Sequence, residues 1–515
     1  MKDRVVNVSL KDIVADLDTP LVKGDLSVEV TGVTHDSRKV VPGWAFVAKP
    51  GAKSDGHEFI SAALKNGAAA IFAQRAEGAE AAGVPWVTLP DTRPALGRIA
   101  AAVYDRPTER LTLVGITGTN GKTTLTFLLE AIIKASGGSP GVVGTIDHRW
   151  KERAVPAANT TPEASDLQRL FHDMVQDGVT HAVMEVSSHG LDLFRSEGCL
   201  FDVGVFTNLT RDHLDHHGTM EEYYRAKRKL FTDLLAHSCK SKRSAVINLD
   251  DPYGLRLAAE ITDLTVIGYG TSDKWSVYPE DASIGHKGIR ADIRTPSGSV
   301  SINSSLTGSF NLMNILAAVA VAERLGIEAD QIRAGIEAVR IVPGRLERID
   351  TPKGTIFVDY AHTPDALKNV LDALGRLGTG RIITVMGCGG DRDRTKRPMM
   401  GTEAAAGSDV VIITSDNPRS EEPDDIIAQV VPGVEAQGFT ELSHHVHGSP
   451  LRPCCYRVMP DRRDAIFWAV ENMSAGDVLL VAGKGHETYQ EIKGIRYPFD
   501  DRETVREALS LTYSA

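Results

Sequence analysis

The segment at residues 118–124 constrains this chain more than any other, because it follows an apolar run at 111–116 and precedes a helical pattern at 125–135. Glycine frees the backbone so that successive N–H groups can face an anion, and the next helix points its positive dipole end at the same place. A lysine here neutralises terminal phosphates, and a neighbouring threonine can hold Mg²⁺. The segment consists of Gly118, Thr119, Asn120, Gly121, Lys122, Thr123 and Thr124. It predicts a nucleotide phosphate site and ATP chemistry.

The segment departs from the strict G-x-x-x-x-G-K-[ST] pattern, because Ile116 stands where the first glycine belongs and Gly115 comes one residue too early. The alternative interpretation is a glycine-rich turn that only caps an ordinary helix. The ordered strand, turn, Lys-Thr-Thr and helix, which ends at Gly137 and Gly138, favour the phosphate site.

The composition limits the class of protein. A chain of 515 residues is too long for one core, and about three domains are expected from typical domain sizes. The formal net charge of -11 disfavours a nucleic-acid binder, which would show a basic face. No apolar run approaches the ~20 residues that cross a bilayer, and the N-terminus lacks a signal-peptide h-region, so we expect a cytoplasmic protein without membrane insertion. Five cysteines without a framework spacing are typical of reduced thiols.

Three alternations of apolar strands and helical stretches predict an α/β protein with three domains. Residues 1–103 form a small α/β domain, 104–342 a central P-loop ATPase-like domain with a mainly parallel sheet, and 343–515 a Rossmann-like α/β domain. In such sheets the ligand crevice lies beyond the carboxyl ends of the strands. Glu185, Asn208 and Asn248 end central strands and should line that crevice, while polar loops at 359–362, 387–394, 415–419 and 483–487 should form an opposing site.

The helical pattern at 220–234 places one lysine on its apolar side. Met220, Tyr224, Phe231 and Leu234 follow one another at intervals of four, seven and three residues, and Lys227 lies on the same stripe, three residues after Tyr224 and four before Phe231. An inward lysine needs a partner, deprotonation or modification, because burying an unpaired ammonium is costly. If Lys227 stood alone, the simpler interpretation would be a side chain that extends along the apolar surface and places its ammonium group in water.

Lys227 does not stand alone, because the acidic and histidine residues at 212–215 lie just upstream and Glu185 ends a neighbouring strand. These groups are plausible ligands of Mg²⁺. The adjacent His216 and His217 are interpreted as structural.

Six segments in a fixed order carry a family resemblance. They are residues 118–124, 159–162, 184–190, 208–215, 308–314 and 359–362. Together they resemble the Mur ligases of peptidoglycan synthesis, and the likeness covers nearly the whole chain. The resemblance implies an ATP- and Mg²⁺-dependent amide ligase acting on small-molecule substrates, with the protein a monomer.

The loop from Asp416 to Arg419 indicates which amino acid is added. The chain resembles the family members that join a diamino acid to UDP-N-acetylmuramoyl-L-alanyl-D-glutamate, and among these the sequence Asp-Asn-Pro-Arg accompanies meso-diaminopimelate. Diaminopimelate has a second carboxylate that lysine lacks, and an arginine fork can bind it through paired, charge-assisted hydrogen bonds.

The resemblance also implies a role for individual residues. The catalytic residues would be Lys122, Glu185, His213 and carbamylated Lys227, and the metal ligands Thr123, Glu185, His213 and Lys227. The nucleotide would contact the phosphate loop together with Asn311, Arg345 and Asp359. The substrate contacts would be Ser37, Asn159, Thr160, Thr161, Ser187, Arg195, Arg392, Asp416, Asn417, Pro418, Arg419, Gly483 and Glu487. Leu193 departs from the family pattern, which commonly has glutamine there, so we expect one substrate hydrogen bond to be missing.

The implied mechanism is attack of the D-glutamate γ-carboxylate on ATP, followed by displacement of phosphate by the amine. Since the two polar sites belong to different domains, we expect domain closure to assemble them. The alternatives are a lysine-adding relative, which Arg419 disfavours, and a folylpolyglutamate-type ligase, which the region at 36–38 disfavours. A nucleotide-switch ATPase and a catalytically idle scaffold are the alternatives from other classes.

A last feature falls outside this account. His444, His445 and His447 precede Cys454 and Cys455, in a spacing that matches no common zinc pattern.

Overall fold

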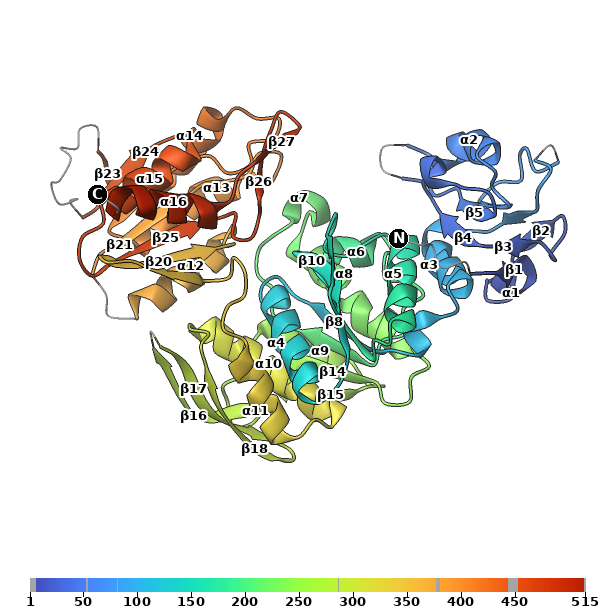
Figure 1. Cartoon of the computed structure of the whole chain (residues 1–515), viewed down its shortest axis with the longest axis horizontal. Coiled ribbons are helices and arrows are strands. Elements are labelled where there is room, and N and C mark those ends of the chain that lie inside the picture. The colour runs from blue at the N-terminus through green and yellow to red at the C-terminus, as the bar shows by residue number, and fades with distance from the viewer. Residues whose placement is uncertain are drawn as a thin grey trace.

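The computed structural model describes residues 6–51, 54–80, 82–285, 287–376, 380–442 and 453–513. Three lobes follow one another along the long axis, in the order of the sequence (Figure 1). Each lobe is built on its own sheet, so the predicted three-domain α/β fold is confirmed. The exact boundaries at 103 and 342 stay a prediction. The histidines at 444–447 lie outside the described residues.

The N-terminal lobe contains a five-stranded sheet in the order β2-β7-β6-β5-β4, in which β2 is antiparallel and the other strands are parallel. Its strands are β1 (Val8–Ser9), β2 (Leu21–Lys23), β3 (Glu29–Val30), β4 (Gly32–Thr34), β5 (Trp44–Val47), β6 (Ala70–Ala73) and β7 (Trp86–Thr88). Its helices are α1 (Leu10–Val14), η1 (Ser37–Lys39), η2 (Gly56–Phe59), α2 (Ile60–Lys65) and α3 (Thr92–Val103).

The central lobe contains an eight-stranded sheet in the order β11-β10-β9-β12-β8-β13-β14-β15, parallel from β9 to β15. Its strands are β8 (Thr112–Thr117), β9 (Pro140–Val143), β10 (Asp147–Trp150), β11 (Arg153–Pro156), β12 (His181–Glu185), β13 (Val203–Phe206), β14 (Ser244–Asn248) and β15 (Thr265–Tyr269). A three-stranded antiparallel sheet follows, with β16 (Tyr278–Gly285), β17 (Gly288–Thr295) and β18 (Gly298–Ser304).

Helices cover both faces of the central sheet. They are η3 (Pro107–Glu109), α4 (Lys122–Ala135), α5 (Ala164–Gln176), α6 (Ser188–Asp192), α7 (Leu214–His217), α8 (Met220–Lys229), the π-helical turn η4 (Leu230–Leu235), α9 (Pro252–Glu260), α10 (Ser309–Leu325) and α11 (Ala329–Ala338). One core joins α4 and α10 to one face of the sheet, and another joins α5, α8 and η4 to the opposite face. Burial of these apolar faces leaves the carboxyl edge of β8, β12 and β13 open to carry polar groups.

The C-terminal lobe contains a seven-stranded sheet in the order β19-β20-β25-β21-β22-β24-β23, in which only β19 is antiparallel. Its strands are β19 (Glu347–Asp350), β20 (Gly354–Asp359), β21 (Ile382–Met386), β22 (Val410–Ile413), β23 (Thr440–Glu441), β24 (Cys455–Val458) and β25 (Asp477–Ala482), with the separate hairpin β26 (Tyr489–Ile492) and β27 (Ile495–Pro498). Its helices are α12 (Pro364–Gly375), α13 (Lys396–Ala406), α14 (Pro423–Glu435), α15 (Arg462–Glu471) and α16 (Asp501–Tyr513).

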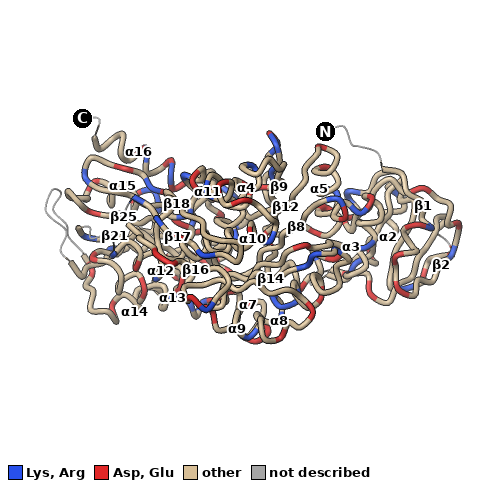
Figure 2. The backbone as a smooth tube through the Cα atoms, turned by 90° about the horizontal axis from the view of Figure 1, so that it is seen from below, with Lys and Arg blue, Asp and Glu red and all other residues tan. Residues whose placement is uncertain are grey.

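Basic and acidic residues are interspersed along the backbone of all three lobes (Figure 2). This pattern is typical of a protein that does not rely on one basic face for binding. Among the described helices, none is long and apolar enough to span a bilayer.

Candidate functional site

The phosphate loop lies between the carboxyl ends of β8 and β13. The Thr119 N–H donates to the Asn208 carbonyl over 2.9 Å, and the Asn120 N–H donates to Asn208 Oδ1 over 2.9 Å. Gly118 has a φ of +146°, and a Cβ there would lie 1.9 Å from Thr207 Oγ1. Glycine is therefore required for both the backbone angle and the close approach of β13. The loop is fixed by the neighbouring strand and delivers its residues directly into α4.

Two lysines converge on the loop. The Nζ atoms of Lys122 and Lys227 each donate to the Gly118 carbonyl over 2.8 Å, and Lys122 also donates to the Thr119 carbonyl over 2.8 Å. Lys227 is 1% exposed, and no carboxylate of the described residues lies within ion-pair distance of it. Burial and then the charge of Lys122 lower the Lys227 pKa well below its usual value, and burial also lowers the Lys122 pKa. Two buried lysines with so little compensating negative charge make a site suited to anions.

Oxygen donors collect beside these lysines. Thr123 Oγ1 donates to Glu185 Oε1 over 3.0 Å, and the Glu185 carboxylate also accepts from the N–H and hydroxyl of Thr145, each over 2.9 Å. Arg345 Nη2, from the segment that begins the C-terminal lobe, donates to Thr123 Oγ1 over 3.2 Å. Hydroxyl and carboxylate oxygens are the ligands that Mg²⁺ prefers.

A cavity of about 450 Å³ opens above the loop. Of the residues predicted from the sequence, its lining includes Thr119, Asn120, Gly121, Lys122, Thr123, Thr124, Thr160, Glu185, Ser187, His213, Arg345 and Asp359. Gly118 and Lys227 lie behind that lining. Asn311 also lies behind it and accepts a hydrogen bond from Asn314 Nδ2 over 3.1 Å, and Asn314 is the residue that faces the cavity.

A second cavity of about 160 Å³ lies against the C-terminal sheet. Its lining includes six of the predicted substrate contacts, namely Arg392, Asp416, Asn417, Arg419, Gly483 and Glu487. Arg419 has a φ of +53°, which is unusual for a residue other than glycine. Its N–H donates to the Glu491 carbonyl over 3.0 Å, and its Nη1 donates to the Gly390 carbonyl over 2.7 Å. The hairpin β26–β27 thus holds the Arg419 backbone in a strained conformation, as often occurs at binding sites.

The two cavities share four lining residues: Asp212, His213, Tyr360 and His362. His362 lies 3.8 Å from the Asp212 carboxylate, and Lys396 Nζ donates to the His362 carbonyl over 3.0 Å. Burial opposes ionisation of Asp212, but His213, His362 and Lys396 lower its pKa to about 2. Burial lowers the His213 pKa to about 3, against the pull of Asp212. The junction thus holds a carboxylate and a neutral imidazole at neutral pH.

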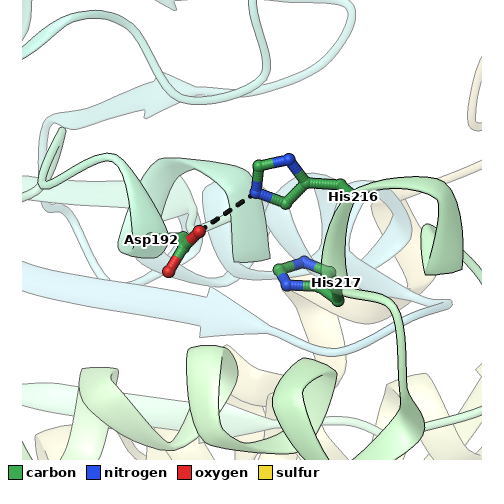
Figure 3. Close-up of side chains that lie close together, drawn as sticks. All are labelled: Asp192, His216 and His217. Carbon is green, nitrogen blue, oxygen red and sulfur yellow. Dashed lines mark hydrogen bonds and ion pairs between the residues drawn. The ribbon is translucent and has the colours of Figure 1, made fainter. Parts of the chain in front are cut away.

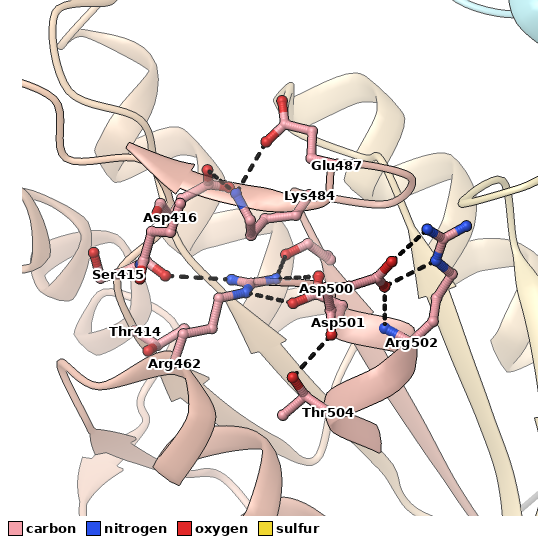
Figure 4. A network of polar contacts seen from close by, with 12 residues as sticks. Thr414, Ser415, Asp416, Arg462, Lys484, Glu487, Asp500, Asp501, Arg502 and Thr504 are labelled. Carbon is pink, nitrogen blue, oxygen red and sulfur yellow. Dashed lines mark hydrogen bonds and ion pairs between the residues drawn. The ribbon is translucent and has the colours of Figure 1, made fainter. Parts of the chain in front are cut away.

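A buried polar network supports the second cavity (Figure 4). Lys484 Nζ donates to Glu487 Oε2 over 3.0 Å and to Asn417 Oδ1 over 3.1 Å, and Asn417 Nδ2 donates to Glu487 Oε2 over 2.8 Å. Burial and the nearby Asp416 raise the Glu487 pKa, while Lys484 and Asn417 oppose that rise. The network fixes the Glu487 carboxylate by two partners, Lys484 and Asn417, which also contact each other.

Arg462 lies beneath the loop that carries Lys484 and Glu487. Its side chain is fully buried, and it donates to both oxygens of the equally buried Asp501 over 2.8 Å and to the Ala482 carbonyl over 2.9 Å. This pair ties α15 and α16 to the end of β25, immediately before Gly483. Charge-assisted bidentate pairs of this kind orient the loops above them.

The remaining predicted residues lie toward the N-terminal lobe. Thr161 Oγ1 donates to the Glu185 carbonyl over 3.0 Å and lies 3.1 Å from Ser187 Oγ, while Arg195 Nη1 donates to the Thr161 carbonyl over 3.2 Å. Glu163 links the lobes, since one oxygen pairs with Arg195 Nε at 2.8 Å and the other with Lys49 Nζ at 2.6 Å.

Three further positions lie outside both cavities. Ser37 is buried in η1 and its carbonyl accepts from Asn66 Nδ2, Asn159 is exposed, and Pro418 follows Asn417. Leu193, which differs from the glutamine common in the family, is 43% exposed.

Sequence reasoning missed several residues of the site. Asn314 lines the first cavity, and Lys396 lines the second. Lys484 and Arg462 lie beneath Glu487. Lys484 lies within the predicted loop at 483–487 and could have been found from that motif, whereas Arg462 carries no local signal.

Comparison with known proteins places the chain among characterised families. The Mur ligase middle domain matches residues 116–322, the Mur ligase glutamate ligase domain matches 344–485, and the Mur ligase family catalytic domain matches 29–104. A relative from Geobacter metallireducens, UDP-N-acetylmuramoyl-L-alanyl-D-glutamate--2,6-diaminopimelate ligase, is 47% identical over 97% of this chain and 98% of its own length. The chain belongs to the Mur ligase family. The resemblance inferred from six motifs is thereby confirmed.

Two further comparisons agree with this membership. A ligase of the same name from Geobacillus kaustophilus is 44% identical over 93% of this chain and 95% of its own. A solved structure of a protein with that name superposes with a TM-score of 0.67 at 33% identity, and covers 98% of this chain and 99% of that one. The likeness to Mur ligases therefore extends over all three lobes.

Proposed function

We propose that this Mur ligase adds meso-diaminopimelate to the D-glutamate γ-carboxylate of UDP-N-acetylmuramoyl-L-alanyl-D-glutamate, at the expense of ATP, in the synthesis of peptidoglycan precursors. The observation that carries the proposal is the junction of the two cavities at Asp212, His213, Tyr360 and His362. One cavity is suited to phosphates, and the other presents both an arginine and a carboxylate. A ligase that passes an activated carboxylate to an amine needs these two sites side by side.

ATP and Mg²⁺ fit the donors of the first cavity. The triphosphate would lie at the loop and the N-terminus of α4, with Lys122 beside it. Mg²⁺ would be held by Thr123, Glu185, His213 and Lys227, of which the first two already share a hydrogen bond of 3.0 Å. When bound, Mg²⁺ supplies neutralisation of phosphate charge. Asp359 would fix the backbone at the edge of this nucleotide site, since its carboxylate accepts hydrogen bonds from the N–H groups of Leu346 and Ala361 over 2.6 and 2.7 Å.

Carbamylation of Lys227 would explain how a lysine can be buried here without a carboxylate partner among the described residues. Only a neutral amine attacks CO₂, and burial favours the neutral form of this side chain. The amine nitrogen bonds to the carbon of CO₂, one carbon–oxygen π bond opens onto oxygen, and the nitrogen releases a proton, so that the amine becomes a carbamate whose oxygens suit a metal ion. Its closeness to the Gly118 carbonyl sets the modified end beside the phosphate loop.

The reaction would then take two steps. An oxygen of the γ-carboxylate attacks the γ-phosphorus, ADP leaves, and an acyl phosphate forms. The amine nitrogen attacks the acyl carbon, the carbon–oxygen bond to phosphate breaks, and an amide forms as the nitrogen loses a proton. Lys122 stabilises charge in the first step, and the chain contributes mainly by alignment, as phosphoryl transfer requires.

Diaminopimelate would bind in the second cavity through both its ends. Arg419 and Arg392 present guanidinium groups to a carboxylate, and Glu487 presents a carboxylate to an ammonium. A lysine-adding ligase has no second carboxylate to bind, so Arg419 favours diaminopimelate. The UDP-dipeptide would extend toward the N-terminal lobe along Thr160, Thr161, Ser187 and Arg195, with Asn159 and Ser37 beyond.

Phosphate release by the full-length enzyme tests this proposal. With ATP, Mg²⁺ and the UDP-dipeptide, we expect release and a tripeptide product of the correct mass with meso-diaminopimelate and not with L-lysine. Preference for lysine would overturn the specificity but keep the ligase. Release that ignores both amino acids would favour a nucleotide-switch ATPase instead.

A further inference from the structure

Three side chains that could ligate a metal ion meet beside the phosphate site. Asp192 ends α6, and His216 and His217 end α7 (Figure 3). His216 Nε2 lies 3.1 Å from Asp192 Oδ2, and one ligand atom from each of the three residues lies within 4.8 Å of the others. Two short helices thus present two imidazoles and a carboxylate to one point.

A third imidazole stands next to this cluster. The His189 ring centroid, from the first turn of α6, lies 4.2 Å from that of His216 and 5.5 Å from that of His217. Imidazole rings this close together would repel one another if they were all protonated. A bound cation would give the lone pairs of neutral rings a common partner.

We propose that Asp192, His216 and His217 form a binding site for a divalent transition-metal ion of the Zn²⁺ class, separate from the Mg²⁺ site at Thr123 and Glu185. Two imidazoles and one carboxylate are a ligand set that Zn²⁺ accepts with a fourth position open. Mg²⁺ prefers a ligand set dominated by oxygen atoms in octahedral geometry, so it competes poorly for a site in which two of three protein ligands are imidazoles. His189 or water takes the fourth position.

The surroundings leave the ligand atoms usable. Lys229 Nζ contacts Asp192 Oδ1 at 3.1 Å, so Oδ2 remains directed at His216. Ser188 Oγ lies 3.0 Å from His217 Nε2. This hydroxyl can rotate away when a metal ion binds that nitrogen.

The position of the site gives it a structural consequence. α6 follows β12 and Glu185 through Ser187, and α7 begins directly after His213. An ion shared by the ends of both helices would tie the His213 loop to the strand that carries Glu185. Binding should therefore raise the thermal stability of the protein as well as being detectable directly.

Metal titration of the full-length protein tests the site. Exposed thiols such as Cys239 and Cys454 are first alkylated, excess Mg²⁺ is present, and Zn²⁺ affinity is measured by competition with a chromogenic chelator. Co²⁺ replaces Zn²⁺ in a parallel titration, because its visible bands report imidazole ligation. The variants are His216→Ala, Asp192→Asn and a matched control, His237→Ala, which removes an exposed histidine elsewhere.

The wild type and His237→Ala should each bind one equivalent of Zn²⁺ at this site. His216→Ala and Asp192→Asn should bind that equivalent at least about 10-fold more weakly, because even the loss of a residue that only hydrogen-bonds a metal ligand lowers metal affinity by that much. The Co²⁺ bands and the Zn²⁺-dependent rise in Tm should disappear with them. Equal Zn²⁺ affinity and equal Co²⁺ spectra in all four proteins would overturn the proposal. So would loss of binding in His237→Ala alone.

Discussion

Replacement of Lys484 by methionine removes the cation that stabilises Glu487 while nearly keeping the volume of the side chain. Lys484 is completely buried and lies 3.0 Å from Glu487 Oε2. The chain contains a matched control, because Lys493 lies at the same 3.0 Å from Glu422 but is 66% exposed. The two substitutions therefore remove ion pairs of equal length that differ in burial.

The magnitudes follow from that difference. Breaking a buried ion pair by removing one partner costs about 3–5 kcal/mol, whereas an exposed pair contributes about 0–1 kcal/mol. A hydrogen bond to a charged group contributes about 1.5–3 kcal/mol, and one pKa unit corresponds to about 1.4 kcal/mol, so the Glu487 pKa should rise by a further ~1–2 units.

The sign of the pH dependence is fixed by the same argument. The folded-state pKa of Glu487 already lies above its usual value because of burial and Asp416. The unfolded chain therefore releases this proton at lower pH than the folded protein does. Raising the pH through that window destabilises the fold, and the penalty in Lys484→Met is smallest in acid.

Two assays measure the effect. Guanidinium unfolding gives the stability of each variant at several pH values, and amino-acid-dependent phosphate release gives the acidic limb of kcat/KM for diaminopimelate. That limb should move to higher pH in Lys484→Met and stay in place in Lys493→Met. Equal stability and equal pH profiles in both variants would refute the assignment of Lys484 as the group that keeps Glu487 ionised.

Two further predictions concern the cavities themselves. Arg419→Lys replaces a planar fork by a point charge, so kcat/KM for diaminopimelate should fall roughly 10–100-fold; an unchanged value would remove Arg419 from the binding site. Gly118→Ala should abolish ATP-dependent phosphate release, because its Cβ would lie 1.9 Å from Thr207 Oγ1. Gly137→Ala, also at positive φ but with nothing within 4 Å, should cost only about 1–2 kcal/mol of stability and keep activity. Equal activity of the two glycine variants would contradict the close approach inferred for the loop.

The sequence predicted those parts of the site that depend on local order. The phosphate loop lies at the end of β8, and the expected strands at 182–185 and 203–208 correspond to β12 and β13, since strand, glycine turn and helix follow from short-range signals. The inward position of Lys227 followed from its helical spacing, although the helix continues into a π-helical turn from Leu230 that spacing alone does not reveal.

Long-range packing explains what the sequence left out. Arg462 meets Asp501 across 39 residues, and nothing near either residue indicates that both are buried. Asn314 rather than Asn311 faces the first cavity, because the two residues lie one turn apart on α10 and only the packing of that helix selects between them. The junction of the two cavities at Asp212 and His362 likewise depends on how two lobes meet, which motif order does not encode.

Isotope transfer tests the central claim, that one activated carboxylate passes between the two cavities. The γ-carboxylate of the UDP-dipeptide is labelled with oxygen-18, and the enzyme turns over with ATP, Mg²⁺ and meso-diaminopimelate. If an acyl phosphate forms at the loop and is displaced by the amine, the released phosphate carries one labelled oxygen and the amide keeps the other. Unlabelled phosphate, with both labelled oxygens still in the unreacted carboxylate, would contradict the account.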